Sequence, residues 1–144
     1  MKAESEPIAD DEWLLRRVPL QYWDSPRAFE PRLLGKNVRD PDISGISFYR
    51  ESCLTHPEDI LAPVPPEKWG NNGIVRIPMA LVIELGLSAQ LEPDARVKGH
   101  VVIPELRAEI HAANKSHLGP LLVILAATAR ENVVRRPNSI GTVD

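Results

Sequence analysis

The chain has 144 residues, the length of one domain, and its 17 basic and 20 acidic side chains give a net charge of −3. This balance disfavours a sequence-independent nucleic-acid binder, which carries a strong positive bias. A single cysteine, Cys53, excludes an internal disulfide, so we expect a reducing, cytoplasmic setting and a buried thiol. The longest apolar run, residues 121–127, is far shorter than the ~20 residues of a membrane span, and no membrane partner is expected.

The two ends of the sequence predict tails. Residues 1–10 are polar and acidic, and we expect a disordered acidic tail there. Residues 138–144 are predicted to be a flexible tail as well. A single domain is therefore expected over residues 11–137.

Prolines divide this body into short elements, because 14 of them are spread along the chain. The apolar patterns predict strands over 13–18, 45–50, 74–77 and 99–103. Short helices are predicted near 55–62, 78–86, 106–113 and 120–130. Since no regular β-α-β repetition occurs, we predict an α+β fold with a small mixed or mostly antiparallel sheet and several short helices.

The ends of the predicted helices carry sequence signals. Thr55 and Glu58 have the spacing of a capping box. Pro78 suits a first helical turn, and Gly86 suits the position just after a helix. Pro120 is expected to open the last helix, which is apolar on every side and therefore predicted to be buried all round.

Two adjacent arginines, Arg16 and Arg17, stand in the first predicted strand. Successive side chains of a strand point to opposite faces, so one arginine must point toward the apolar side. A buried arginine requires an anionic partner, either a carboxylate or a ligand phosphate. The sequence leaves open an ion pair with an acid such as Glu51 or Glu58, and a ligand-binding role for Arg16.

His100 stands in an apolar predicted strand, directly after a glycine that allows a ligand or a backbone to approach. A ligand-binding histidine and a histidine satisfied by one structural hydrogen bond both fit this position. The remaining histidines do not supply the three or four converging ligands that zinc requires, so no metal site is predicted.

Three aromatic residues, Tyr22, Trp23 and Trp69, fall in proline-rich segments. Aromatic side chains in such segments are typical anchors for a protein partner. They are equally typical of small clusters that pack beneath a loop. Both interpretations stay open for these three residues.

Four segments resemble parts of a set of uncharacterised bacterial proteins. Residues 14–18 resemble the arginine-rich first strand of that set, and residues 27–31 its "AF-P" segment. Residues 45–49 resemble its "LSVY"-like strand, and residues 99–103 its "HAVI"-like strand. The resemblance covers residues 13–104 and implies no known activity.

A more distant resemblance is to ADP-ribosyltransferase-like domains, including RES-type toxins, and it rests on Arg17, Tyr49 and a later glutamate, Glu105 or Glu109. It implies that the arginine holds a phosphate of NAD, that the tyrosine borders the nicotinamide, and that the glutamate orients the ribose. A carboxylate there would stabilise the oxocarbenium-like transition state. NAD and a toxin–antitoxin setting are expected only under this resemblance, and without it no cofactor is predicted.

The leading functional interpretation is a non-catalytic bacterial protein that acts through a protein partner. The alternative is an NAD-consuming or ADP-ribosyl-transferring enzyme, so the sequence leaves open whether the chain is an enzyme. A third interpretation, disfavoured by the net charge, is nucleic-acid binding through Arg27, Arg32, Lys36 and Arg39. The oligomeric state and the identity of a partner do not follow from the sequence.

Overall fold

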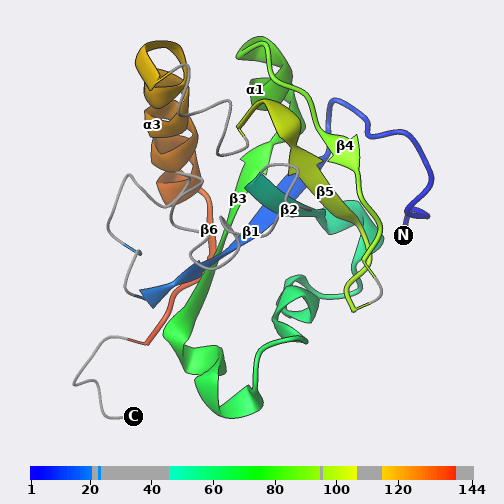
Figure 1. Ribbon diagram of the computed structural model, residues 1–144. Helices are drawn as coiled ribbons and strands as arrows, with labels where there is room; N and C mark the ends of the chain where they lie inside the picture. Colours follow the sequence, from blue (N-terminus) through cyan, green and yellow to red (C-terminus); the bar gives the residue numbers. More distant parts are fainter. Residues whose placement is uncertain (21–22, 24–45, 95, 107–114, 139–144) are drawn as a thin grey trace.

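The computed structural model describes residues 1–20, 23, 46–94, 96–106 and 115–138, and it has the predicted single-domain α+β fold (Figure 1). One six-stranded sheet has the strand order β4-β5-β2-β1-β3-β6, and every neighbouring pair is antiparallel. The strands are β1 (Trp13–Pro19), β2 (Ile46–Arg50), β3 (Asn72–Pro78), β4 (Gln90–Leu91), β5 (His100–Ile103) and β6 (Val133–Arg135). The helices are α1 (Met79–Glu84) and α3 (Lys115–Glu131), with 3-10 turns η4 (Glu51–Cys53), η5 (Pro57–Leu61), η6 (Pro66–Asn71) and η7 (Pro104–Leu106).

Prolines mark the ends of three strands. Pro19 is the last residue of β1, Pro78 is the last residue of β3, and Pro104 follows β5 directly. A proline has no backbone N–H to donate to the ladder, so pairing ends there. The four predicted strands are confirmed to within two residues, whereas the short strands β4 and β6 were not predicted.

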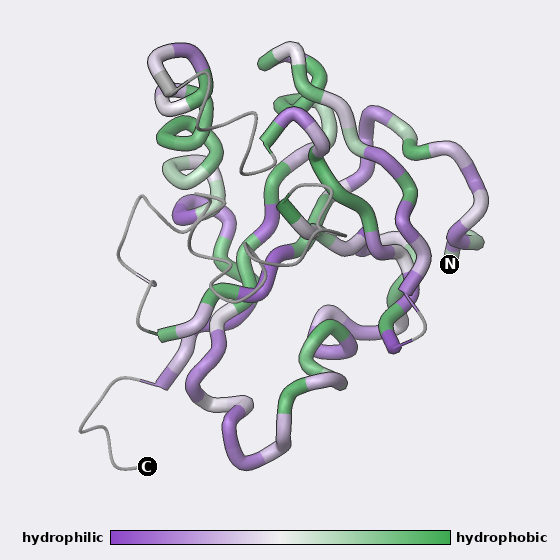
Figure 2. The backbone as a smooth tube through the Cα atoms, viewed as in Figure 1, coloured by the Kyte–Doolittle hydropathy of each residue, from purple (hydrophilic) through white to green (hydrophobic). Residues whose placement is uncertain are grey.

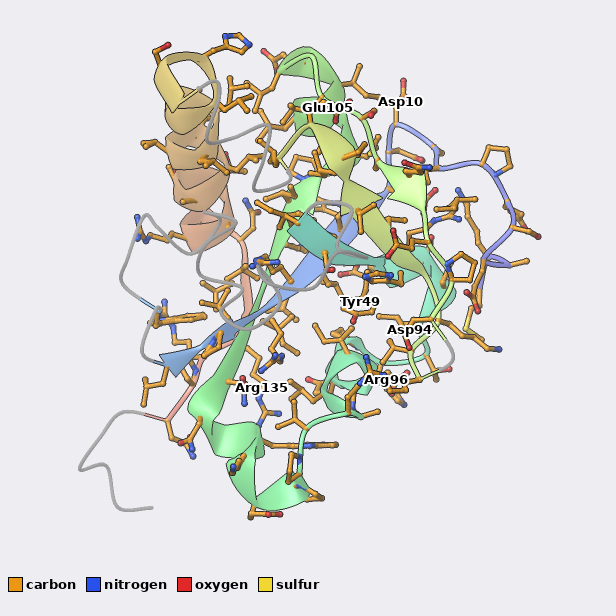
Figure 3. All side chains as sticks on the ribbon, viewed as in Figure 1. Asp10, Tyr49, Asp94, Arg96, Glu105 and Arg135 are labelled. Atoms are coloured by element: carbon orange, nitrogen blue, oxygen red, sulfur yellow. The ribbon has the colours of Figure 1, made fainter. Side chains whose placement is uncertain are left out.

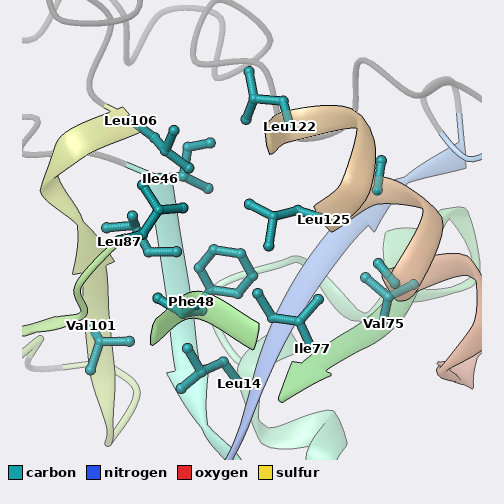
Figure 4. Close-up of a cluster of buried hydrophobic side chains, with 14 of the residues drawn as sticks. Leu14, Ile46, Phe48, Val75, Ile77, Leu87, Val101, Leu106, Leu122 and Leu125 are labelled. Carbon is teal, nitrogen blue, oxygen red and sulfur yellow. The ribbon is translucent and has the colours of Figure 1, made fainter. Parts of the chain in front are cut away.

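Each face of the sheet carries its own apolar cluster. Leu14 and Phe48 lie on the face that α1 and α3 cover, which we call the helix-covered face (Figure 4). Leu15 and Ile74 lie on the other face, against η5 and Trp69 of η6, and we call it the 3-10 face. The alternation of β1 therefore places neighbouring leucines in different cores.

The seam between β1 and β2 is paired at one end only. Its register pairs are Leu14 with Arg50 and Leu15 with Tyr49. The Arg50 N–H donates to the Gly99 carbonyl oxygen, just before β5, so the backbone groups of Arg50 point toward β5. Successive residues of a strand direct their backbone groups to opposite neighbours, so those of Tyr49 and Ser47 point toward β1. The Ser47 carbonyl oxygen accepts from the Arg16 side chain at 2.9 Å, so a side chain closes this part of the seam.

The helices agree with the sequence patterns in part. Gly86, which follows α1, has a φ of 76° and so confirms the left-handed helix end that was predicted for it. The first short helix is a 3-10 turn whose N-cap is His56, one residue after the predicted Thr55, because the His56 N–H donates to Asp59 Oδ2 at 3.1 Å. The predicted helix 106–113 lies outside the described residues from position 107 onward.

Helix α3 differs from its prediction in two respects. It includes Lys115 to Pro120, so Pro120 stands inside the helix on its exposed side rather than opening it. It is also not buried all round, since Val123 and Ile124 are 56% and 41% exposed. A helix whose residues are apolar on every side can still have an exposed side, because burial depends on what the rest of the fold covers.

Residues 1–12, most of which were expected to be a disordered tail, are held against the body by a buried ion pair. Glu12 accepts from Arg50 Nε and Nη2, each at 2.8 Å, and both side chains are almost fully buried. The other Arg50 contacts are backbone carbonyl oxygens of Glu4, Glu6 and Pro7. A fully bonded guanidinium fixes a segment whose sequence alone has little apolar surface to bury.

Candidate anion-binding site

Arg16 and Arg17 leave β1 on opposite faces, as the alternation of a strand predicts. Arg16 is 8% exposed on the helix-covered face, with its guanidinium carbon 5.8 Å from the centroid of the Phe48 ring. Burial, followed by the nearby charge of Arg17, lowers the pKa of Arg16 to about 10, so it is still a cation at neutral pH. Glu51, one of its expected partners, instead pairs with Arg76 at 3.1 Å. Arg16 therefore contributes to the fold by binding the Ser47 carbonyl oxygen.

Arg17 is exposed on the 3-10 face, where Arg135 of β6 joins it. Both residues are register partners of Ile74, one from each neighbouring strand. Adjacent strands lie ~4.8 Å apart, so the two Cα atoms are about 10 Å apart across the buried isoleucine. Long guanidinium side chains at that spacing can contact one ligand together, and we call Arg17 and Arg135 the arginine pair.

Neither member of the arginine pair forms an ion pair with any residue that the structure describes. Arg17 Nη1 donates to Asn72 Oδ1 at 2.8 Å, and Asn72 Nδ2 donates to the Lys68 carbonyl oxygen at 2.9 Å. Arg135 Nε is buried and has no hydrogen-bond partner among the residues that the structure describes. A buried donor without an acceptor costs ~1–3 kcal/mol, so an incoming acceptor is favoured at this position.

Ser47 and His100 extend the polar surface of the 3-10 face toward β5. His100 Nε2 lies 3.0 Å from Ser47 Oγ, and its Nδ1 lies 2.6 Å from the Glu92 carbonyl oxygen. A carbonyl oxygen only accepts, so Nδ1 is the donor to Glu92, and in the tautomer with its proton on Nδ1 the Nε2 atom accepts from the Ser47 hydroxyl. This geometry is that of a serine and its base, and it is equally that of a histidine whose two ring nitrogens are both satisfied.

Tyr49 links this histidine to a pair of charges. Its ring centroid lies 5.2 Å from that of His100, and the two rings are tilted by 46°. Burial raises the pKa of Tyr49 and the Asp94 carboxylate raises it further, while Arg96 and Arg17 act in the opposite direction. Hydrogen bonds from the Arg96 N–H and then from its side chain lower the pKa of Asp94. Figure 3 shows Tyr49, Asp94 and Arg96 gathered in one region.

The structure brings together some of the residues proposed for an NAD site and separates others. Arg17 and Tyr49 share the 3-10 face of neighbouring strands. Glu105 lies beyond the opposite end of β5 (Figure 3), where its carboxylate accepts from the Ser88 N–H and hydroxyl at 3.0 and 2.6 Å. Tyr49 pairs with His100 at the start of β5, whereas Glu105 follows the end of this strand at Ile103. The three steps from His100 to Ile103 already span about 10 Å, so the Glu105 side chain does not reach Tyr49. Glu109 lies outside the described residues.

The aromatic residues considered as partner anchors are packed into the fold where they are described. Trp23 is half-buried and its ring covers Gly73, where a Cβ atom would collide with it. Trp69 is half-buried in the 3-10 cluster, and its indole N–H donates to the Val64 carbonyl oxygen at 2.8 Å. Tyr22 lies outside the described residues, as do the four basic residues of the nucleic-acid interpretation.

Two further observations concern the cysteine and the possible metal ligands. Cys53 is 1% exposed, as expected of a buried thiol. Among the described residues, no group of three or more His, Cys, Asp or Glu side chains is placed to hold a metal ion. The sequence did not single out Arg135, Asn72 or Ser47, because each acquires its role from a strand pairing with a distant segment.

Comparison with known proteins found no matching family model, no matching curated protein and no matching solved structure. Within the described part of the chain, no helix is both long enough and apolar enough to cross a membrane.

Proposed function

We propose that this protein is a non-catalytic binding module that acts through a protein partner, and that the partner presents an acidic segment to Arg17 and Arg135. The observation that carries the proposal is the contrast between the arginine pair and three other described arginines. Arg50, Arg76 and Arg96 each have a carboxylate partner. The arginine pair has none among the described residues, although Arg135 buries a donor nitrogen.

The chemistry of the arginine pair favours carboxylates on a protein. A guanidinium presents a planar fork of donors that matches a carboxylate, and the bond is strengthened by charge. Two such groups about 10 Å apart can bind acidic residues of one short segment. A nucleic acid is disfavoured as the partner by the net charge of −3. A reducing cytoplasmic setting, which fits the lone buried cysteine, belongs to the same proposal.

The test is calorimetric titration of the full chain with a short poly-glutamate peptide. We expect Arg17→Ala and Arg135→Ala each to weaken binding by about tenfold or more, since a hydrogen bond to a charged group contributes about 1.5–3 kcal/mol. Arg96→Ala is the matched control, because Arg96 is exposed but already bound to Asp94. Equal affinity of all four proteins for the peptide, or no binding by the unmodified chain, would overturn the proposal.

A second candidate is the NAD-consuming enzyme, which is supported by the common face of Arg17 and Tyr49. In this version the arginine pair would hold the diphosphate, and the carboxylate near the tyrosine is Asp94 rather than Glu105. The test is release of nicotinamide from NAD by the full chain. Release that is lost in Asp94→Asn and kept in Glu105→Gln would support the enzyme, and no release would reject it.

A further inference from the structure

The hydroxyl of Ser47 faces a histidine, whereas the hydroxyl of another described serine, Ser88, faces a carboxylate. Ser47 Oγ lies 3.0 Å from His100 Nε2, and Ser88 Oγ donates to Glu105 Oε2 at 2.6 Å. A carboxylate takes up a proton only at about pH 4, whereas an imidazole does so close to neutral pH, so the imidazole is the stronger base. Ser47 is therefore the better placed of the two serines to lose its proton and react.

His100 is held in the orientation that a base for Ser47 requires. Its Nδ1 donates to the Glu92 carbonyl oxygen at 2.6 Å, so in the neutral ring the Nε2 atom has the lone pair that accepts the serine proton. The backbone keeps the two residues together, because the Glu92 N–H donates to the His100 carbonyl oxygen at 3.0 Å. A nucleophile, a base within hydrogen-bond distance and a group that orients the base form the arrangement of an activated serine.

Arg17 supplies a positive charge beside this serine. The register of β1 and β2 pairs Leu15 with Tyr49, and two residues further along each strand it places Arg17 opposite Ser47 on the 3-10 face. Adjacent strands lie ~4.8 Å apart, so the long Arg17 side chain can contact an anion that is bound at Ser47. Figure 2 shows hydrophilic stretches within the strands of this sheet as well as hydrophobic ones. Ser47 and His100 are both partly exposed, so the hydroxyl is open to a small molecule.

We propose that Ser47 is an acylation site, and that it accepts an acyl group from a small acyl phosphate. In this step His100 Nε2 takes the proton of the Ser47 hydroxyl, and Ser47 Oγ forms a bond to the carbonyl carbon of the donor. The bond from that carbon to the phosphate oxygen breaks, and its electron pair leaves with the phosphate. The imidazolium then gives its proton to the released phosphate, which leaves an ester on Ser47. Arg17 stabilises the negative charge of the phosphate as it departs.

This modification goes beyond the proposed partner binding and does not rest on it. Ser47 and His100 are not members of the arginine pair, and the step transfers one acyl group to the chain without turnover. An acylated Ser47 is therefore compatible with a non-catalytic protein. An anionic donor is favoured over a neutral one because Arg17 has no carboxylate partner among the described residues.

The first experiment treats the full chain with acetyl phosphate at neutral pH and locates the acetyl groups by peptide mass mapping. We expect an acetyl ester at Ser47 that forms at least about a hundredfold more slowly in His100→Gln, since a general base contributes about 10²–10⁴-fold. Ser88→Ala is the matched control and should leave acetylation of Ser47 unchanged, because its hydroxyl faces Glu105 instead. No acetyl ester at Ser47, or an equal rate in His100→Gln, would overturn the proposal.

The second experiment tests the role of Arg17 with two donors, acetyl phosphate and the neutral ester p-nitrophenyl acetate. Arg17→Ala should slow acetylation of Ser47 by acetyl phosphate about tenfold or more, since a hydrogen bond to a charged group contributes about 1.5–3 kcal/mol. The rate with the neutral ester should stay nearly the same. Arg130→Ala is the matched control, because Arg130 is exposed on α3 at the helix-covered face. Equal slowing with both donors, or equal slowing in Arg130→Ala, would contradict the proposal.

Discussion

Two regions of this molecule hold arginines in opposite ways. At one end of β2, Arg50 is fully buried and donates to both oxygens of Glu12 and to three backbone carbonyl oxygens. On the 3-10 face, Arg17 and Arg135 have no carboxylate among the described residues. A cation whose donors are all satisfied by the chain is part of the structure. A cation that has no counter-charge among the described residues has interaction energy available for a ligand.

The largest effect that would test this comparison is expected from Arg50→Met. The substitution leaves Glu12 buried without its partner, and loss of one member of a buried ion pair costs about 3–5 kcal/mol of unfolding free energy. Urea denaturation measures this loss of unfolding free energy. The double variant Glu12→Gln with Arg50→Met removes both charges and should recover much of the loss. A change below about 1 kcal/mol in the single variant would mean that the pair does not hold the N-terminal segment.

Acid should weaken the Arg50 region next. Burial by itself would raise the pKa of Glu12, but hydrogen bonds from Arg50, Ser52 and the Ala9 N–H lower it from 4.5 to about 2. A carboxyl group whose pKa is lower in the folded state stabilises the fold above its unfolded pKa, and this stability is lost as the pH falls. We therefore expect the urea midpoint to fall between pH 4.5 and about 2. The double variant should show a flatter dependence over the same range.

A smaller effect, within about 0.5 kcal/mol of unfolding free energy, is expected when either arginine of the pair is removed. Arg17→Ala and Arg135→Ala take away charges that repel each other and, at Arg135, a donor that has no acceptor. Arg17→Ala also loses the hydrogen bond to Asn72, which offsets the relieved repulsion, so thermal denaturation should show both variants close to the unmodified chain in stability. A loss above about 2 kcal/mol in either variant would assign that arginine to the structure rather than to ligand binding.

The smallest effect is expected at Arg96. Its side chain is 70% exposed and pairs with Asp94 at 3.3 Å. Exposed ion pairs contribute about 0–1 kcal/mol, so Arg96→Ala should change the unfolding free energy by less than that. The same denaturation series measures it. A larger loss would show that the turn before β5 depends on this pair.

The sequence predicts these regions to different extents. Arg16 and Arg17 were expected on opposite faces from the two-residue period of a strand, and their burial follows that expectation. Arg135 was missed because β6 has only three residues, too few for a periodic pattern, and is defined by pairing with Ile74. Local patterns report local structure, whereas β6 exists only through a distant partner.

The same limit explains the N-terminal segment and the NAD residues. Glu12 and Arg50 are 38 positions apart, so composition alone indicated an acidic tail where the structure has a bound segment. Glu105 was placed with Arg17 and Tyr49 by order along the chain, but order does not fix which end of a strand a residue occupies. The fold class was predictable because it depends on element types, while a site depends on register.

The bound N-terminal segment also determines where the protein can be shortened. A chain trimmed to begin at Trp13, the first residue of the sheet, would retain the six described strands and yet lose the carboxylate of Glu12 that Arg50 binds. The Glu12 carbonyl oxygen, which accepts from the Met79 N–H at 2.9 Å at the start of α1, would be lost with it. The minimal folding unit therefore begins ahead of the first strand, at the segment that carries Glu12.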